Sequence, residues 1–319
     1  MTLDVLGWNG RWQKEFAALD SEGLAPGRVV GEHRSHFRVA IEATELSAGT
    51  TGRMRNAAQE RSDLPGVGDF VALRLAAGDG QATIEAVLPR TSALVRKASG
   101  ESRPQLLAAN IDVVFIMTTP GADLNLPRLE RYLALVRDSG AAPVIVVNKS
   151  DLAHDAVEIT GQISGIAPAV PIHVVSARGR DHIDDLERYF DGNRTIAFIG
   201  SSGVGKSTLT NLLLGRTAQA TQEVRTNDSR GRHTTTHRQL FTRPLGGSII
   251  DTPGMRSLEV WNTPAEAAGG FEDIEALATR CKFRNCRHDS EPACAVRAAV
   301  ERGDLDAGRA AAYLLSHAN

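Results

Sequence analysis

Residues 200–208 of this chain read Gly200-Ser201-Ser202-Gly203-Val204-Gly205-Lys206-Ser207-Thr208. The stretch fits the pattern G-x-x-x-x-G-K-[ST], follows the apolar run 196–199 and opens a helical pattern, so a chance lysine in a glycine-rich turn is disfavoured. In such a loop, glycines let backbone N–H groups surround phosphate oxygens, and the helix N-terminus favours negative charge. We therefore expect a nucleotide-phosphate site, with Lys206 as a catalytic group at the β- and γ-phosphates and Ser207 on Mg²⁺.

A second pattern selects the base. Directly after the apolar run 143–147 stands Asn148-Lys149-Ser150-Asp151. Ligands of open α/β sheets lie at the carboxyl ends of the strands. The Asp151 carboxylate can accept from both the ring N–H and the exocyclic amine of guanine, whereas adenine would leave this acceptor unpaired. We expect Asn148 to contact the other edge of the base and the stem of Lys149 to pack over it, which favours GTP over ATP.

Two shorter patterns complete the expected nucleotide site. Ser176-Ala177 follows the short apolar run 173–175 and is expected to give a backbone amide to the guanine oxygen. Asp251-Thr252-Pro253-Gly254 follows the apolar residues 248–250 and matches D-x-x-G. In that pattern Asp251 binds Mg²⁺ through water, and the amide of Gly254 contacts the γ-phosphate.

The segment between the phosphate loop and D-x-x-G reads Arg230-Gly231-Arg232-His233-Thr234-Thr235-Thr236-His237. It is placed where a switch loop gives a threonine to Mg²⁺. We expect Thr235, although the sequence does not separate it from the threonines on either side.

Met255 stands where many GTPases place a glutamine that orients water, and a thioether cannot do this. Either hydrolysis is slow until a partner binds, or another side chain orients the water. His233 is our catalytic candidate for that role. Its alternative roles are packing or contact with RNA.

The order of these motifs is unusual. Ordinary small GTPases run phosphate loop, switch threonine, D-x-x-G, N-K-x-D and S-A, whereas here N-K-S-D and S-A come first. The order predicts a circularly permuted G domain in which a helix over 182–190 leads straight into the phosphate-loop strand. D-T-P-G then lies near the C-terminal segment, so a change in this switch on loss of the γ-phosphate could move that segment.

The cysteines form one cluster. The spacing Cys281-x4-Cys286-x-His288-x5-Cys294 uses all three cysteines of the chain. Three thiolates and an imidazole match a closed tetrahedral zinc site, with no open position for catalysis. A small alanine-rich segment with little core of its own needs such a staple. The sequence therefore predicts one structural zinc ion per chain rather than free thiols.

Length and composition fit a multidomain globular protein. The chain has 319 residues, 36 Lys plus Arg against 38 Asp plus Glu, and a formal net charge of −2, so charge alone indicates no nucleic acid partner. Short alternating runs over 27–31, 36–41, 69–75 and 82–88 predict an N-terminal β-barrel. Continuous apolar runs alternating with helical patterns predict a parallel sheet after residue 101. We expect domains at 1–100, 101–262 and 263–319 in a cytoplasmic protein, since we find neither a signal peptide nor a membrane span.

The permuted motif order, with G-R-H-T-T-T and the cysteine spacing, resembles the RsgA (YjeQ) family of ribosome small subunit-dependent GTPases over nearly the whole chain. The stretches Leu6-Gly7-Trp8 and 23–29 also resemble that family's opening. The resemblance implies an N-terminal OB-fold, a central permuted P-loop GTPase and a C-terminal, mostly helical zinc domain. It further implies GTP hydrolysis stimulated by the 30S subunit during its late maturation.

RNA contact is implied by the resemblance more than by the residues. Basic candidates lie in the barrel region and in the switch segment: Arg53, Arg55, Arg61, Arg90, Arg96, Lys97, Arg225, Arg230, Arg232 and Arg238. Only Phe37 and Phe70 offer aromatic rings in the expected strands, so phosphate and shape contacts to 16S rRNA fit better than base stacking. We expect the protein to be a monomer. The alternatives are a GTP-dependent RNA-binding switch with incidental hydrolysis, or a metal- or membrane-linked regulatory GTPase that never meets the ribosome.

Overall fold

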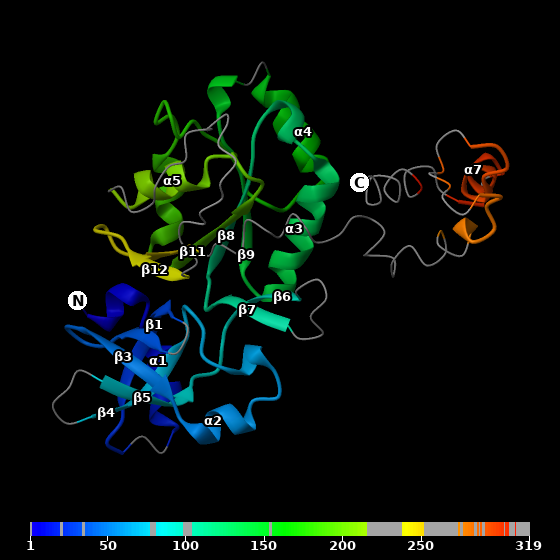
Figure 1. Ribbon diagram of the computed structural model, residues 1–319. Coiled ribbons are helices and arrows are strands. Elements are labelled where there is room, and N and C mark those ends of the chain that lie inside the picture. The colour runs from blue at the N-terminus through cyan, green and yellow to red at the C-terminus, as the bar shows by residue number, and fades with distance from the viewer. Residues whose placement is uncertain are drawn as a thin grey trace, which may run out of the picture. The chain divides into compact units, whose positions relative to one another are not determined.

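The computed structural model groups the chain into two compact units, residues 1–258 and 259–319. Each unit is described by itself (Figure 1). The described residues are 2–19, 22–33, 36–76, 81–97, 104–152, 155–215, 238–251, 274, 277–283, 286, 288, 291–302, 304–305 and 310. Among these residues no helix is long and apolar enough to cross a bilayer.

An N-terminal barrel is built from five strands. They are β1 (Ala25–Glu32), β2 (Phe37–Ala40), β3 (Glu45–Thr50), β4 (Phe70–Leu75) and β5 (Gln81–Val87). The strand order β1-β2-β3-β5-β4 closes through a further β1–β4 pairing, and β3 runs parallel to β5. This order is the connectivity of the expected OB-fold. Strand β3 was not predicted from the sequence, because its first residues, Glu45-Leu46-Ser47-Ala48, include too few apolar side chains.

Helical elements lie beside the barrel strands in the chain. The aromatic residue Trp12 of α1 (Gly10–Ala17) packs on Phe70 with ring centroids 4.4 Å apart, and both side chains are buried. Phe70 therefore belongs to the core of this region and is not available for base stacking. Arg53 and Arg55 lie on α2 (Gly52–Ala57) and Arg61 begins the 3₁₀ helix η2 (Arg61–Asp63), where the sequence suggested a long loop.

A hairpin and a buried arginine join the barrel to the rest of the unit. The hairpin pairs β6 (Ala93–Lys97) with β7 (Pro104–Ala109) and was not expected from the sequence. Arg28 in β1 is buried and donates to the carbonyls of Leu6 in η1 (Leu3–Leu6), Gly68 at 3.1 Å and Asn110 at 3.1 Å. Burial lowers the pKa of Arg28 to about 10, against the opposing effect of Asp112 and Asp69.

The central α/β region contains a six-stranded stretch of sheet ordered β10-β9-β8-β11-β13-β12. Its strands are β8 (Val113–Thr118), β9 (Ala142–Val147), β10 (Ile172–Val174), β11 (Thr195–Gly200), β12 (Gln239–Thr242) and β13 (Ser248–Asp251). All neighbours pair in parallel except β12 with β13. The start of β12 also pairs with the end of β1, at Gln239 and Gly31, so one continuous sheet runs from this region into the barrel.

Helices cover both faces of this sheet (Figure 1). One face packs on α3 (Leu126–Ser139) and α4 (Ala156–Ile166), and the other on α5 (Lys206–Leu213) and the 3₁₀ helix η5 (Asp184–Phe190). Alternate residues of β8 show the division, because Ile116 belongs to the first core and Phe115 to the second. The doubly wound parallel sheet predicted from the continuous apolar runs is therefore confirmed.

The connection that permits the permuted order is short. The sequence predicted a helix over 182–190, and the structure has η5 at Asp184–Phe190, with 3₁₀ geometry rather than an α-helix. Leu186 and Phe190 anchor it in the core, and five residues later the chain enters β11.

Unit 259–319 has a small core of its own. Its described core residues are Ile274, Cys294, Val296, Ala299, Leu305 and Ala310. Helix α7 (Ala295–Glu301) supplies two of them and begins directly after Cys294. A core this small does not hold such a segment together without a further constraint.

Candidate functional site

The predicted nucleotide motifs meet at one edge of the sheet. Strands β9, β10, β11 and β13 run parallel, and each ends in one of the motifs. The phosphate loop follows β11, residues 148–151 follow β9, Ser176-Ala177 follows β10, and Asp251 ends β13. The fold thereby brings together every predicted nucleotide-site residue that lies in the described part of the chain.

Two glycines of the phosphate loop stand where no side chain fits. A Cβ on Gly200 would collide with the carbonyl oxygen of Met117 in β8, and one on Gly205 with the amide nitrogen of Asn148. Both glycines also have positive φ angles, 146° and 97°. Helix α5 starts at Lys206, whose Nζ donates to the carbonyls of Gly200 at 2.5 Å and of Ser201. The lysine ammonium thus lies against the start of the loop.

Asn148 joins the phosphate loop to the S-A loop. Its Nδ2 donates to the carbonyl of Val204 at 2.8 Å, and its Oδ1 accepts from the backbone N–H of Ala177 at 3.0 Å. The sequence reading assigned Asn148 to the base alone. An amide has two N–H donors and two acceptor lone pairs, so bracing the loops is compatible with that contact. The side chain is buried, which fits a group that fixes both loops.

Ser176 orients Asp151. The Ser176 hydroxyl donates to Oδ1 of Asp151 at 2.7 Å and accepts from the backbone N–H of Gly179 at 3.0 Å. Ser176 is buried, whereas Asp151 is exposed at the edge of the sheet. The sequence reading gave Ser176 only a backbone role. Its side chain instead holds the carboxylate that is expected to read guanine.

Asp123 is a site residue that the sequence reading missed. It ends the 3₁₀ helix η3 (Gly121–Asp123) after β8, and its carboxylate accepts from the hydroxyl of Ser201 in the phosphate loop. It also accepts from the backbone N–H of Thr119 at 3.2 Å and pairs with Arg128 at 2.6 Å. An acidic residue in a short surface turn carries no sequence signal for this contact.

Two of the three residues expected to bind Mg²⁺ lie in the described part of the chain. Ser207 is the second residue of α5, and Asp251 ends β13, which pairs directly with the phosphate-loop strand β11. A hydroxyl and a carboxylate are hard oxygen ligands of the kind that Mg²⁺ prefers. His233, Thr235, Gly254 and Met255 lie outside the described residues.

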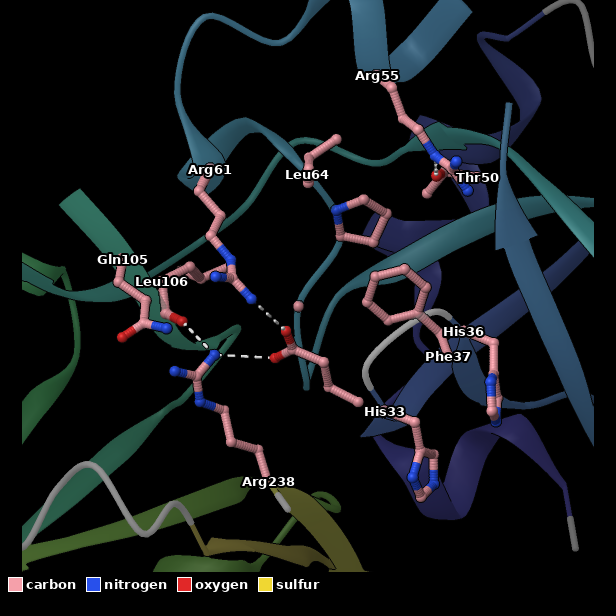
Figure 2. A pocket seen from close by; sticks show the side chains of 13 residues that line it. His33, His36, Phe37, Thr50, Arg55, Arg61, Leu64, Gln105, Leu106 and Arg238 are labelled. Carbon is pink, nitrogen blue, oxygen red and sulfur yellow. Dashed lines mark hydrogen bonds and ion pairs between the residues drawn. The ribbon is translucent and has the colours of Figure 1, made fainter. Parts of the chain in front are cut away.

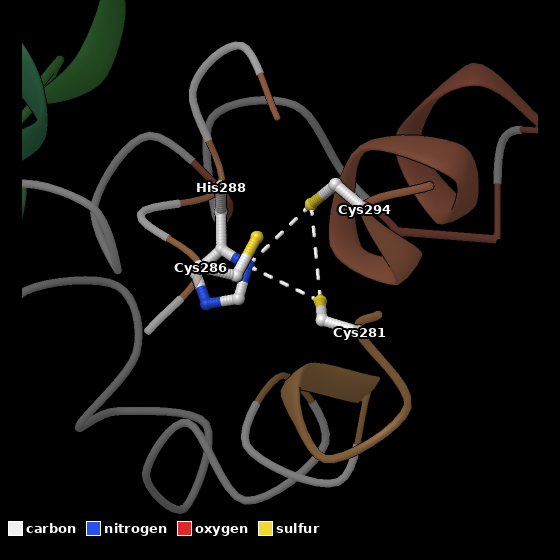
Figure 3. A group of neighbouring side chains, drawn as sticks. All are labelled: Cys281, Cys286, His288 and Cys294. Carbon is white, nitrogen blue, oxygen red and sulfur yellow. Dashed lines mark hydrogen bonds between the residues drawn. The ribbon is translucent and has the colours of Figure 1, made fainter. Parts of the chain in front are cut away.

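The cysteines and the histidine form a compact cluster (Figure 3). The ligand atoms of Cys281, Cys286, His288 and Cys294 lie within 4.8 Å of one another. The Sγ atoms of Cys281 and Cys294 are 4.0 Å apart, and Nδ1 of His288 lies 3.5 and 3.4 Å from them. Tetrahedral zinc, with Zn–S of about 2.3 Å and Zn–N of about 2.0 Å, requires ligand separations of about 3.5–3.8 Å. The four groups therefore fit a metal ion.

Helix α7 contributes to this cluster. The backbone N–H of Ala295 donates to Sγ of Cys281 at 3.3 Å, and that of Arg297 to Sγ of Cys294 at 3.4 Å. Burial alone would raise the pKa of Cys281, but hydrogen bonds from the backbone of Ala295 and Val296 and from the thiols of Cys286 and Cys294 together lower it. Thiolate is the form that binds metals.

Two of the proposed RNA-binding arginines have other partners. Arg90 donates to both carboxylate oxygens of buried Asp69, at 2.8 and 2.7 Å, and to the carbonyls of Ser62 and Leu64. Arg238 donates to Glu32 at 2.8 Å and to the carbonyl of Leu106 at 2.9 Å (Figure 2). Both arginines therefore stabilise the fold, and their contact with rRNA stays a prediction. The side chains of Arg96 and Lys97, and residues 225, 230 and 232, lie outside the described part.

The fold and the site define a circularly permuted P-loop GTPase with a Cys₃His metal site. Residues 87–261 match the model of the RsgA GTPase family. The chain is 43% identical over 313 residues to "Small ribosomal subunit biogenesis GTPase RsgA 2" of Lactiplantibacillus plantarum, covering 98% of this chain and 88% of that protein. It is 44% identical to the RsgA of Opitutus terrae, with the same shares covered.

A solved structure has the same fold. The crystal structure of YjeQ from Thermotoga maritima superposes with a TM-score of 0.57 at 26% identity, covering 92% of this chain and 97% of that one. The chain belongs to the RsgA GTPase family.

Proposed function

We propose that this protein hydrolyses GTP to GDP and phosphate on the small (30S) ribosomal subunit, in the late maturation of that subunit. The observation that carries the proposal is the meeting of the guanine-reading and phosphate-binding motifs at one sheet edge, in a chain of this family. Relatives at 43–44% identity bear the name small ribosomal subunit biogenesis GTPase. The partner surface would include 16S rRNA, and the protein would act as a cytoplasmic monomer.

Each motif then has a part in binding and hydrolysis. Asp151, held by Ser176, accepts from the guanine N–H groups, and the amide of Ala177 reaches the guanine oxygen. The phosphate-loop N–H groups and Lys206 stabilise the negative charge on the phosphates. Ser207, Thr235 and Asp251 would hold Mg²⁺, which neutralises charge on the β- and γ-phosphates when bound. His233 remains our candidate for orienting the attacking water, and the amide of Gly254 for contacting the γ-phosphate.

We assign the metal of the cysteine cluster as zinc with a structural role. Three thiolates and an imidazole select zinc over hard cations, and four protein ligands leave no position for substrate. The proposed domain division remains 1–100, 101–262 and 263–319. The cluster lies wholly in the last of these, where it would hold a small core together.

Replacing Asp151 by asparagine is expected to weaken GTP binding about 100-fold, since hydrogen bonds to a charged acceptor contribute about 1.5–3 kcal/mol. The same variant is expected to gain affinity for XTP, because an amide accepts from the xanthine N–H and donates to its 2-oxo group. Competition titrations of both nucleotides measure the ratio. Asp138→Asn, an exposed change on α3, is the control. An unchanged GTP-to-XTP ratio in Asp151→Asn would remove Asp151 from base recognition.

Binding to the ribosomal particle is testable separately from chemistry. The protein is expected to co-sediment with purified 30S subunits when a non-hydrolysable GTP analogue is present, and less with GDP. Co-sedimentation under neither condition would show that the partner is wrong, whereas the nucleotide specificity would stand. Tight analogue-dependent binding without stimulated hydrolysis would favour the second candidate, a GTP-dependent RNA-binding switch. Met255 cannot orient water by hydrogen bonding, so hydrolysis must either wait for the partner or use another side chain.

A further inference from the structure

The turn after β8 holds an ion pair beside the phosphate loop. Asp123, the last residue of η3, pairs at 2.6 Å with Arg128 in the first turn of α3. Neither residue belongs to one of the nucleotide motifs. The side chains of Arg128 and Asp123 are 21% and 23% exposed, and pairs that solvent reaches contribute only modestly to stability. Fold stability alone therefore does not explain the pair.

Strand register places this turn against the start of the loop. In the parallel pairing of β8 with β11, Met117 lies opposite Gly200, so both strands end at the same edge. Ser201 follows Gly200 and is buried, and its hydroxyl donates to Oδ1 of Asp123. The backbone carbonyl of Ser201 accepts from Nζ of Lys206. The side chain of this first loop residue is thus held from the β8 side.

The Asp123 carboxylate is fixed by further donors. Its Oδ1 also accepts from the guanidinium of Arg128, and its Oδ2 accepts from the backbone N–H of Thr119 at 3.2 Å. The hydroxyl of Thr118 donates to the backbone carbonyl of Asp123 at 3.1 Å, which holds the turn itself. Both carboxylate oxygens are therefore engaged, and the turn presents one fixed acceptor to the phosphate loop.

A carboxylate at this place has an electrostatic consequence for the nucleotide. The N–H groups of the loop are expected to surround phosphate oxygens, and a single serine side chain separates Asp123 from the loop. An uncompensated negative charge there would repel the phosphates, and the repulsion would increase with the charge of the nucleotide. Arg128 compensates this charge, because it donates to the carboxylate at 2.6 Å and to the backbone carbonyl of Asp123 at 2.5 Å.

We propose that Asp123 is a positioning residue for the phosphate loop, that it acts through the Ser201 hydroxyl, and that Arg128 makes its charge compatible with a bound nucleoside triphosphate. The inference rests on the proposed function, because the loop is the one that takes the phosphates of GTP. A hydroxyl bonds more strongly to a carboxylate than to a neutral acceptor, so the loop is held firmly. The arginine is the condition for using a carboxylate there.

The link through Ser201 is tested by a double-mutant cycle in the full-length protein. Displacement of fluorescent mant-GDP by the non-hydrolysable analogue guanosine 5′-(β,γ-imido)triphosphate measures affinity without turnover. Ser201→Ala is expected to weaken analogue binding about tenfold in the wild type, but less than about twofold in an Asp123→Ala background. An equal loss in both backgrounds, or no loss in either, would overturn the link.

The role of the arginine is tested by rescue. Arg128→Gln is expected to weaken the analogue about tenfold and GDP only about threefold, because the triphosphate carries more negative charge. Adding Asp123→Asn is expected to restore both affinities to within about twofold of wild type, since the amide is neutral and still accepts from the serine hydroxyl. Equal losses for the two nucleotides without rescue would show a merely structural arginine and contradict the proposal.

Matched controls lie on the same helix. Arg137→Gln and Asp138→Asn make the same charge changes at exposed positions of α3, about 14 Å along the helix from Arg128. Both are expected to bind the analogue and GDP as wild type does, and a loss in Arg137→Gln equal to that in Arg128→Gln would overturn the specific role. Wild type that binds neither nucleotide would defeat the proposed function itself, whereas tight wild-type binding with unaffected variants would defeat this inference alone.

Discussion

Replacing Lys206 by alanine is expected to lower 30S-stimulated GTP turnover by at least about 100-fold, the cost of removing one group that stabilises transition-state charge. The structure shows Lys206 at the first residue of α5 with its ammonium against the carbonyls of Gly200 and Ser201. No other described lysine lies in this loop.

Steady-state phosphate release at saturating GTP measures this effect. Lys14→Ala, an exposed lysine on α1, is the matched control and is expected to retain full turnover. A folded Lys206→Ala protein that still turns over GTP at the wild-type rate would contradict the assigned chemistry. Measuring GTP affinity in the same variant separates lost binding from lost catalysis.

Removing the metal is expected to have the second large effect, on the C-terminal unit. Structural zinc sites contribute roughly 10–16 kcal/mol of apparent binding free energy, which in a small domain is folding free energy. The core of residues 259–319 is small, and Cys294 belongs both to that core and to the cluster. Cys281→Ser or a strong chelator is therefore expected to unfold this unit while GTP binding by residues 1–258 persists.

Zinc content per chain and hydrogen exchange over residues 277–302 measure this outcome. One zinc per chain is expected in the wild type, and far less than one in Cys281→Ser, with loss of exchange protection in α7. Arg302→Ala, just beyond α7, is the control because its exposed ion pair with Asp304 contributes little. Unchanged protection in α7 after complete removal of the metal would show that the metal does not hold the fold.

The motifs made the central region predictable from sequence. A phosphate loop needs glycines where neighbouring atoms leave no room for a side chain, and Gly200 and Gly205 occupy such positions. The continuous apolar runs predicted the five parallel strands. A strand that is buried on both faces is apolar at nearly every position, and this pattern is visible in the sequence. The cysteine spacing likewise located a metal cluster, since four ligands must converge on one point.

Other features left no local pattern. Strand β3 is held by its pairing with β2 and β5 rather than by apolar alternation. The contact of Asp123 with Ser201 joins residues 78 positions apart, and the pairs of Arg90 and Arg238 depend equally on tertiary structure. The sequence does not show whether an arginine is exposed or buried with partners in the fold. The arginines that contact RNA could therefore not be selected from the sequence. His233 and Thr235 stay predictions, because they lie outside the described residues.

GTP turnover by the wild-type protein with and without purified 30S subunits tests the central claim most directly. We expect slow intrinsic hydrolysis and an increase of at least about tenfold with 30S subunits, with the stimulated rate abolished in Lys206→Ala. Such an increase would establish a hydrolase activated by the ribosomal subunit. Turnover that is the same with and without 30S subunits would contradict the proposed function, even if GTP binds tightly.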